Sequence, residues 1–237
     1  NVNSYRDPVS GEPFSALLGR VARTPGIEWI RFITSHPKDL GDDIIAAMAE
    51  NRNICRQLHL PFQSGSSAVL ARMNRGYTRE IYLDIVDRLR DKMPGIGLST
   101  DIIVGFPGET EADFEETLDL VQRVRFVNVF SFRYSPRPGT AAARIPDDVP
   151  LAVKSRRLIA LQGLQKKIQL ENNKTMIGKT EKILALGSSK KDKLVHTGRN
   201  EAFQVVNFRC PGDPTGKFLD VRITDCGPYS LFGECPA

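Results

Sequence analysis

The most informative segment of the chain is residues 101–110, with the sequence DIIVGFPGET. An apolar, β-branched run ends there at two glycines and a proline, and Thr110 with Asp113 has the T-x-x-D spacing that caps a helix. In α/β proteins, ligands bind at the carboxyl ends of parallel strands, where glycine lets the backbone come close. The segment therefore favours an enzyme core, although a tight strand-to-helix connection without a ligand would use the same residues.

The cysteines do not have the spacing of a metal site. Cys55, Cys210, Cys226 and Cys235 are scattered without C-x-x-C or C-x-x-x-C-x-x-C patterns, so we expect reduced structural thiols. No apolar run reaches the roughly 20 residues that span a bilayer, and no signal-like segment is recognisable. We therefore expect a cytoplasmic protein without a membrane partner.

Strands and helices alternate through the first two thirds of the chain. Strands are predicted at residues 28–34, 54–61, 97–104 and 127–134. Helices are predicted at residues 42–51, 66–73, 79–93 and 111–125. This alternation predicts a parallel sheet or barrel with right-handed crossovers.

A further helix is predicted after Pro150, with an apolar stripe formed by Leu158, Leu161, Leu164 and Ile168. Its basic side chains, expected largely toward solvent, are Arg156, Arg157, Lys166 and Lys167. The formal net charge is +5, and the excess of basic residues is concentrated in this helix and the segment after it. A basic strip suggests a polyanionic partner such as RNA, but a solvated helix face accounts for the charge equally well.

The last 60 residues have a different sequence pattern, in which short β-like runs replace the alternation of strands and helices. Five short β-like runs are predicted, at residues 182–186, 194–198, 203–208, 218–223 and 229–232. Turn residues separate them, and five short strands are the size of a small OB-like barrel, a fold that often binds oligonucleotides. Phe203 and Phe208 are expected in its core rather than as stacking platforms.

Several of these runs resemble a known family. The segments HLPFQSGS (59–66), MNRGYT (73–78), 101–110 and FSFRYSPRPGT (130–140) are similar to motifs of the radical S-adenosylmethionine methylthiotransferases. In the tail, GRNE (198–201) and VVNF (205–208) resemble their TRAM domain. The resemblance implies an α/β fold: a partial radical-SAM (β/α) barrel with a linking helix at residues 1–174, followed by a small all-β OB-like TRAM domain at residues 175–237.

Within this family, residues 1–5, 34–37 and 205–208 are most similar to the enzymes that modify dimethylallyladenosine in tRNA. The resemblance implies methylthiolation of carbon 2 of the adenosine next to the anticodon, with S-adenosylmethionine as methyl donor and radical source. It also implies two [4Fe-4S] clusters, the tRNA anticodon stem-loop as substrate, and an electron donor protein such as flavodoxin or ferredoxin. None of the family's six cluster cysteines can be matched, so we expect an inactive fragment whose cluster-binding segments precede Asn1.

Particular residues match the family's motifs. Polar side chains after a strand can form hydrogen bonds to a ribose or carboxylate. Glycines let the backbone approach an adenine, and guanidinium groups form bidentate hydrogen bonds to phosphate or carboxylate. The candidate cofactor-binding residues are Asn1, Asn3, Gln63, Ser64, Ser66, Gly105, Pro107, Gly108, Arg133 and Arg137. The candidate RNA-binding residues are Lys190, Lys191, Lys193, Arg199, Arg209 and Lys217.

No residue is assigned a catalytic role, and no metal ligand is expected. His36 and His59 are interpreted as structural histidines, and Asp101 as a buried polar anchor of its strand. Two alternatives remain open. One is a methylthiotransferase that acts on threonylcarbamoyladenosine in tRNA or on a ribosomal protein, and the other is a non-catalytic RNA-binding module.

Overall fold

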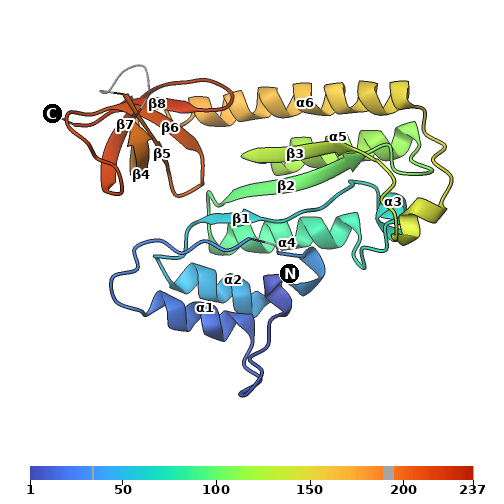
Figure 1. Ribbon diagram of the computed structural model, residues 1–237, viewed down its shortest axis with the longest axis horizontal. Helices are drawn as coiled ribbons and strands as arrows, with labels where there is room; N and C mark the ends of the chain where they lie inside the picture. Colours follow the sequence, from blue (N-terminus) through green and yellow to red (C-terminus); the bar gives the residue numbers. More distant parts are fainter. Residues whose placement is uncertain (34, 189–194, 237) are drawn as a thin grey trace. The chain divides into compact units, whose positions relative to one another are not determined.

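The structure is a computed structural model that describes residues 1–33, 35–188 and 195–236. The chain forms two compact units, Asn1–Gln165 and Lys166–Ala237 (Figure 1). The boundary predicted at residue 174 coincides with the end of the long helix α6, Leu151–Lys174, which runs through the division between the units. Among the described residues, no helix is both long and apolar enough to cross a membrane.

The first unit contains a parallel sheet of three strands in the order β1-β2-β3 (Figure 1). The strands are β1 Gln57–His59, β2 Gly97–Val104 and β3 Asn128–Arg133. The helices are α1 Phe14–Ala22, α2 Asp42–Glu50, α3 Ser67–Arg72, α4 Arg79–Lys92, α5 Glu111–Val124 and the start of α6, with short 3-10 turns η1 Val2–Ser4, η2 Pro37–Asp39 and η3 Ala141–Arg144. The predicted α/β architecture is confirmed.

One face of this sheet is covered by helices. Leu98, Ile102 and Val104 of β2 are almost fully buried on that face. The rings of Phe62, Tyr82 of α4 and Phe126 cluster there, and the Tyr82 phenol donates a hydrogen bond of 2.9 Å to the carbonyl of Leu60. The burial of these large side chains stabilises the unit, at roughly 1.5 to 3 kcal/mol for each.

The strand predicted at residues 28–34 is wrong. The described part of that segment makes only an isolated bridge, Ile30 to Ile54, and Thr34 lies outside the described residues. The next predicted strand shortens to β1. Pro61 has no N–H to donate, and the pairing with β2 resumes as an isolated bridge at Gln63, which has a left-handed φ of 71°. Helix α1 was not predicted, since Pro13 stands where a capping side chain would signal its start.

The buried face of helix α6 contains polar side chains in addition to the predicted leucine stripe. Leu161 is fully buried, but Lys154, Arg157 and Gln165 are also at most 4% exposed. The prediction that Arg157 points largely toward solvent is wrong, because it meets acidic side chains of the turn after β2. Long cationic side chains remain buried only when they are paired in this way.

The second unit is a closed β-barrel with the strand order β4-β5-β6-β8-β7. Its strands are β4 Thr180–Ser188, β5 Val195–Arg199, β6 Val205–Arg209, β7 Phe218–Cys226 and β8 Leu231–Glu234. The five predicted strands are confirmed, although Leu194 of the second lies outside the described residues and the third begins at Val205 instead of Phe203. The buried core consists of Ile183, Ala185, Val206, Phe208, Val221, Ile223 and Leu231.

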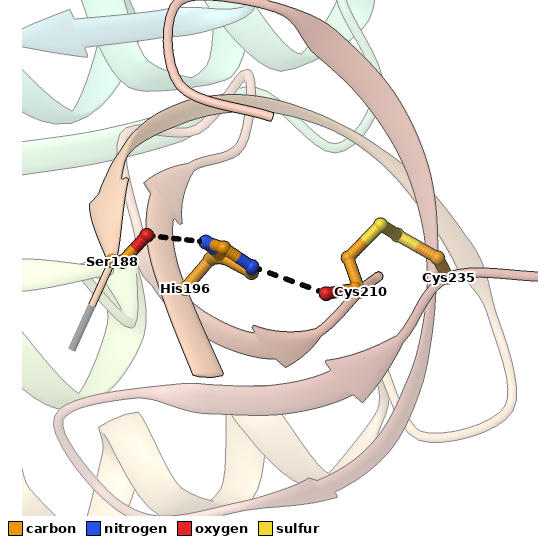
Figure 2. Close-up of a disulfide and its surroundings, with 4 residues drawn as sticks. All are labelled: Ser188, His196, Cys210 and Cys235. Carbon is orange, nitrogen blue, oxygen red and sulfur yellow. Dashed lines mark hydrogen bonds between the residues drawn. A yellow bond between two sulfur atoms is a disulfide. The ribbon is translucent and has the colours of Figure 1, made fainter. Parts of the chain in front are cut away.

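The barrel contains a disulfide between Cys210 and Cys235, whose Cα atoms are 5.3 Å apart (Figure 2). The expectation of four reduced thiols is therefore wrong for this pair, while Cys55 and Cys226 remain thiols. Beside the bridge, buried His196 has Nε2 3.1 Å from the Cys210 carbonyl oxygen and Nδ1 3.0 Å from the Ser188 hydroxyl. Residues 25 positions apart are thus joined at the end of β6.

Candidate active site

The face of the parallel sheet opposite the helices carries polar and aromatic side chains. The register pairs Asp101 of β2 with Phe130 of β3, and Ile103 with Phe132. Residues paired in this way share a face, and the two phenylalanines are 48% and 53% exposed. We call this surface the open face of the sheet.

A histidine and a carboxylate lie together on the open face. His59 Nδ1 is 3.0 Å from the Ser99 hydroxyl, and its Nε2 is 3.5 Å from Asp101 Oδ1. The Phe130 ring meets the imidazole edge-on with centroids 5.8 Å apart. Sequence analysis interpreted His59 and Asp101 as structural, yet the Asp101 side chain is 32% exposed and can accept hydrogen bonds from a ligand.

Three candidate residues lie at the carboxyl ends of the strands. Gln63 extends the β1 edge: its N–H donates to the Asp101 carbonyl and its own carbonyl accepts from Ile103 N–H, both at 2.9 Å. Gly105 follows β2, and Arg133 ends β3, with Nη1 donating to Ser155 Oγ at 3.0 Å. Ligands of parallel α/β sheets bind at this edge.

Ser64 and Ser66 are buried, and their hydroxyl groups have partners within the chain. Ser64 Oγ accepts from the Ser66 N–H at 3.3 Å, and Ser66 donates to Asp113. Asp113 also forms the capping box of α5 with Thr110. The segment is therefore fixed against the start of α5, and a ligand would need to compete with Asp113 for the Ser66 hydroxyl.

The glycine turn after β2 is occupied by groups of the chain itself. The Gly105 N–H donates to Glu109, and the Gly108 N–H donates to Asp148 Oδ1 at 2.7 Å. Both glycines have positive φ, and a Cβ on Gly105 would overlap the Lys154 side chain. Pro107 between them is buried. The free backbone donors expected for an adenine are thus engaged in this structure.

A buried ion pair holds this turn to α6. Arg157 Nη1 lies 2.9 Å from Glu109 Oε2, and Nη2 lies 3.0 Å from Glu111 Oε2. Burial raises the pKa of Glu109, while the Gly105 N–H and the Arg157 guanidinium favour its ionised form. Glu109 Oε1 is buried without a hydrogen-bond partner among the described residues.

Lys154 supports the same turn from one helical turn earlier. Its Nζ lies 2.6 Å from both carboxylate oxygens of Asp147, and 5.1 Å from the centroid of the Tyr134 ring. Sequence analysis missed Glu109, Arg157 and Lys154. The i, i+3 spacing of Lys154 and Arg157 places both cations on the same face of α6 and could have drawn attention to them. Periodicity does not reveal their acidic partners.

The remaining cofactor candidates come from other segments of the first unit. Asn1 donates a hydrogen bond to Asp39 and lines a pocket with Tyr5 and Phe14. Asn3 is buried, and neither its amide oxygen nor its amide nitrogen has a partner among the described residues. An orphaned buried amide fits a polar ligand. Arg137 is exposed in the loop after β3.

The RNA candidates are only partly described. Lys190, Lys191 and Lys193 lie outside the described residues. Arg199 ends β5, Arg209 ends β6, and Lys217 precedes β7; Arg209 and Lys217 are exposed. Arg209 pairs with Val195 at the opposite end of the β5–β6 ladder from Arg199. The structure therefore brings no single cluster together from these three.

Among the described residues, no group of three or more histidine, cysteine, aspartate or glutamate side chains could hold a metal ion. An iron-sulfur cluster needs several thiolate ligands, and Cys55 of the first unit is buried without a neighbouring cysteine ligand set. The described residues therefore do not fit a cluster. Asn3 and Glu109 each present buried polar atoms without a hydrogen-bond partner among the described residues, which is compatible with a polar ligand.

The two units define an α/β domain with polar strand ends, followed by a small OB-like barrel. The family model of the radical SAM superfamily matches residues 4–121, and that of the TRAM domain matches residues 169–235. The chain thus contains a radical SAM domain followed by a TRAM domain.

Relatives of the chain have a shared name. The tRNA-2-methylthio-N(6)-dimethylallyladenosine synthases of Acetivibrio thermocellus and Caldicellulosiruptor saccharolyticus are each 48% identical to it over 99% of its length, covering 49% and 50% of those proteins. The chain thus spans about half the length of the curated relatives it matches. Among solved structures, coproporphyrinogen III oxidase from Escherichia coli, a radical SAM enzyme, aligns with a TM-score of 0.45 and 21% identity over 54% of this chain and 31% of that one.

Proposed function

We propose that this chain is part of an enzyme that adds a methylthio group to carbon 2 of dimethylallyladenosine next to the anticodon in tRNA. The observation that carries the proposal is the 48% identity, over 99% of the chain, to synthases named for this product. The presence of a radical SAM domain and a TRAM domain in one chain supports it.

Bound S-adenosylmethionine would supply the methyl group and the radical that activates the substrate. This chain's residues would bind and orient the reactants. Gln63 and Arg133, at the strand ends, suit the polar groups of the cofactor. On the open face, Asp101 offers a hydrogen-bond acceptor and Phe130 an exposed ring, a combination that suits a flat base with exocyclic N–H groups.

The partners follow from the same proposal. The [4Fe-4S] clusters would be held by cysteines outside this chain, since the described residues do not fit them. The anticodon stem-loop would bind partly through the barrel of the second unit, and a reduced flavodoxin or ferredoxin would supply electrons in the cytoplasm.

Nucleoside analysis tests the proposal. The gene for the full-length protein is expressed in a strain that lacks its own methylthiotransferases, and digested tRNA is analysed by mass spectrometry. We expect 2-methylthio groups on dimethylallyladenosine and none on threonylcarbamoyladenosine. We expect Asp101→Asn to lower the product by at least about tenfold, the equivalent of roughly 1.4 kcal/mol, because the open face loses its charged acceptor.

The exposed Asp91→Asn on α4 is the matched control, and its product level should equal that of the wild type. Product on threonylcarbamoyladenosine, or on a ribosomal protein, would replace the proposed substrate with another. A folded full-length protein that binds tRNA and yields no methylthio product would favour the non-catalytic RNA-binding module.

A further inference from the structure

Phe203 of the barrel is exposed, although sequence analysis expected it in the core. Its side chain is 51% exposed, whereas Phe208, five residues later, is 1% exposed and confirmed in the core. Phe203 lies in the turn between β5 and β6 and has a left-handed φ of 64°. Glycine or asparagine usually occupies such a position, so an aromatic residue there has a conformational cost that the surrounding turn must offset.

The turn holds Phe203 in place through a buried asparagine. Phe203 N–H donates to the Asn200 carbonyl at 3.0 Å, and Gln204 N–H donates to Asn200 Oδ1 at 2.8 Å. Asn200 is 1% exposed, and its Nδ2 donates to Gln204 Oε1 at 2.9 Å. The backbone that carries the ring is therefore held in place before a partner binds, which favours affinity.

A guanidinium group lies against this ring. Arg199 Cζ is 4.7 Å from the centroid of the Phe203 ring, and Arg199 Nη1 donates to the Phe203 carbonyl at 3.0 Å. This pair suits a nucleotide, because a base can stack on the ring face that the guanidinium does not cover, while the cation attracts phosphate. The same pair would have little to offer a purely apolar partner.

The strand register places further residues next to Arg199 and Phe203 on the outer surface of the barrel. Arg199 pairs with Leu184 and with Val205, and Leu184 pairs in turn with Phe218 of β7. Since Ile183, next to Leu184, is in the core, this row faces outward. Lys182 Nζ lies 4.7 Å from the centroid of the Phe218 ring, so a second aromatic-cation pair lies in the row. Exposed Lys217 adjoins Phe218. The acidic neighbours include Glu201, Asp220 and Glu181, whose carboxylate accepts a hydrogen bond from Asn200 Nδ2 at 3.4 Å.

We propose that Phe203, with Arg199 against it, is a stacking site for an unpaired base of RNA. The proposal deepens the proposed function, on which it depends for the identity of the RNA, and assigns to the barrel a contact that distinguishes unpaired bases from duplex. Phosphate contacts alone do not make this distinction.

Affinity measurements with two RNAs test this site. The full-length protein is titrated with a labelled anticodon stem-loop and with a fully paired duplex of the same length, for the wild type, Phe203→Leu and Phe203→Trp. Leucine, phenylalanine and tryptophan have similar backbone strain at a φ of 64°, so the three proteins differ in the ring area that can stack on a base. We expect Phe203→Leu to weaken stem-loop binding by about 5- to 150-fold, the range for one base–aromatic stack, and Phe203→Trp to bind within about twofold of the wild type.

Tyr229→Leu is the matched control, since Tyr229 is a 68% exposed aromatic residue in another turn of the same barrel. We expect it to bind as the wild type does, and duplex binding to be unchanged in every variant. A Phe203→Leu protein that binds the stem-loop as tightly as the wild type would overturn the stacking site while leaving the proposed function intact. An equal loss for stem-loop and duplex would also overturn it. A wild type that binds neither RNA would refute the proposed function itself.

Discussion

Arg157 of helix α6 and Glu109 of the turn after β2 form an ion pair with Nη1 2.9 Å from Oε2, and both side chains are at most 4% exposed. The pair joins a helix to the strand end that carries Gly105, and Glu109 in turn accepts from the Gly105 N–H. The conformation of the glycine turn therefore depends on a cation that is 48 residues away in the sequence.

Arg157→Met should lower the free energy of unfolding of the full-length protein by about 3–5 kcal/mol, because it leaves the Glu109 carboxylate buried without its cation. Arg156→Met is the control: Arg156 is 62% exposed and pairs only at the surface with Glu111, so a loss within about 1 kcal/mol is expected. Chemical denaturation measures both. Equal losses would show that burial does not determine the contribution of the pair.

Glu111 accepts hydrogen bonds from Arg157 and Arg156, which lower the pKa of its carboxyl below the usual value of 4.5. A depressed pKa in the folded state gives stability that is present above about pH 4.5 and is lost as the pH falls through the folded-state pKa. Arg156→Gln should therefore raise the Glu111 pKa, as followed by NMR titration. A titration midpoint that does not move would remove Arg156 as a cause.

Gly105→Ala should be more destabilising than Gly108→Ala by about 1–3 kcal/mol, the usual cost of overpacking. Both glycines have positive φ, so both variants have the same backbone strain. They differ because a Cβ on Gly105 overlaps the buried Lys154 side chain, whereas at Gly108 the nearest atom, Arg72 Nε, is 3.5 Å away. Thermal unfolding of the two proteins measures the difference, and equal costs would contradict the packing of Lys154 on this turn.

Removal of the disulfide by Cys235→Ser should destabilise the barrel by about 3 kcal/mol under non-reducing conditions, the order expected for a bridge that closes a loop of this size. Cys226→Ser, at a free and half-buried cysteine, should cost less. Addition of a dithiol reductant should abolish the difference between the wild type and Cys235→Ser. If the difference persists after reduction, the bridge is not its cause.

The sequence was sufficient where local signals agree. Strand β2 was predicted at its observed bounds because its apolar run lies between glycines, and α5 because Thr110 and Asp113 form a capping box. The five strands of the barrel followed from turn residues and short β-branched runs.

The remaining features depend on contacts between distant residues. Periodicity assigns Arg157 to solvent because it cannot show the partner Glu109, and cysteine spacing cannot show that Cys210 and Cys235 meet. The open face could not be predicted for the same reason, since His59 and Asp101 come together only through the register of β1 on β2. Phe203 was misplaced because an aromatic residue in a β-rich tail usually belongs to the core.

The central claim is that the open face and the strand ends of the first unit belong to an S-adenosylmethionine-dependent methylthiotransferase. The most direct test uses the full-length protein, reconstituted with iron and sulfide without oxygen and supplied with reductant, S-adenosylmethionine and tRNA that carries dimethylallyladenosine. Mass spectrometry then measures 5′-deoxyadenosine and the 2-methylthio nucleoside. We predict that both products form, and that their formation requires the dimethylallyladenosine of the tRNA. A protein that contains its clusters and binds tRNA but cleaves no S-adenosylmethionine would contradict the account.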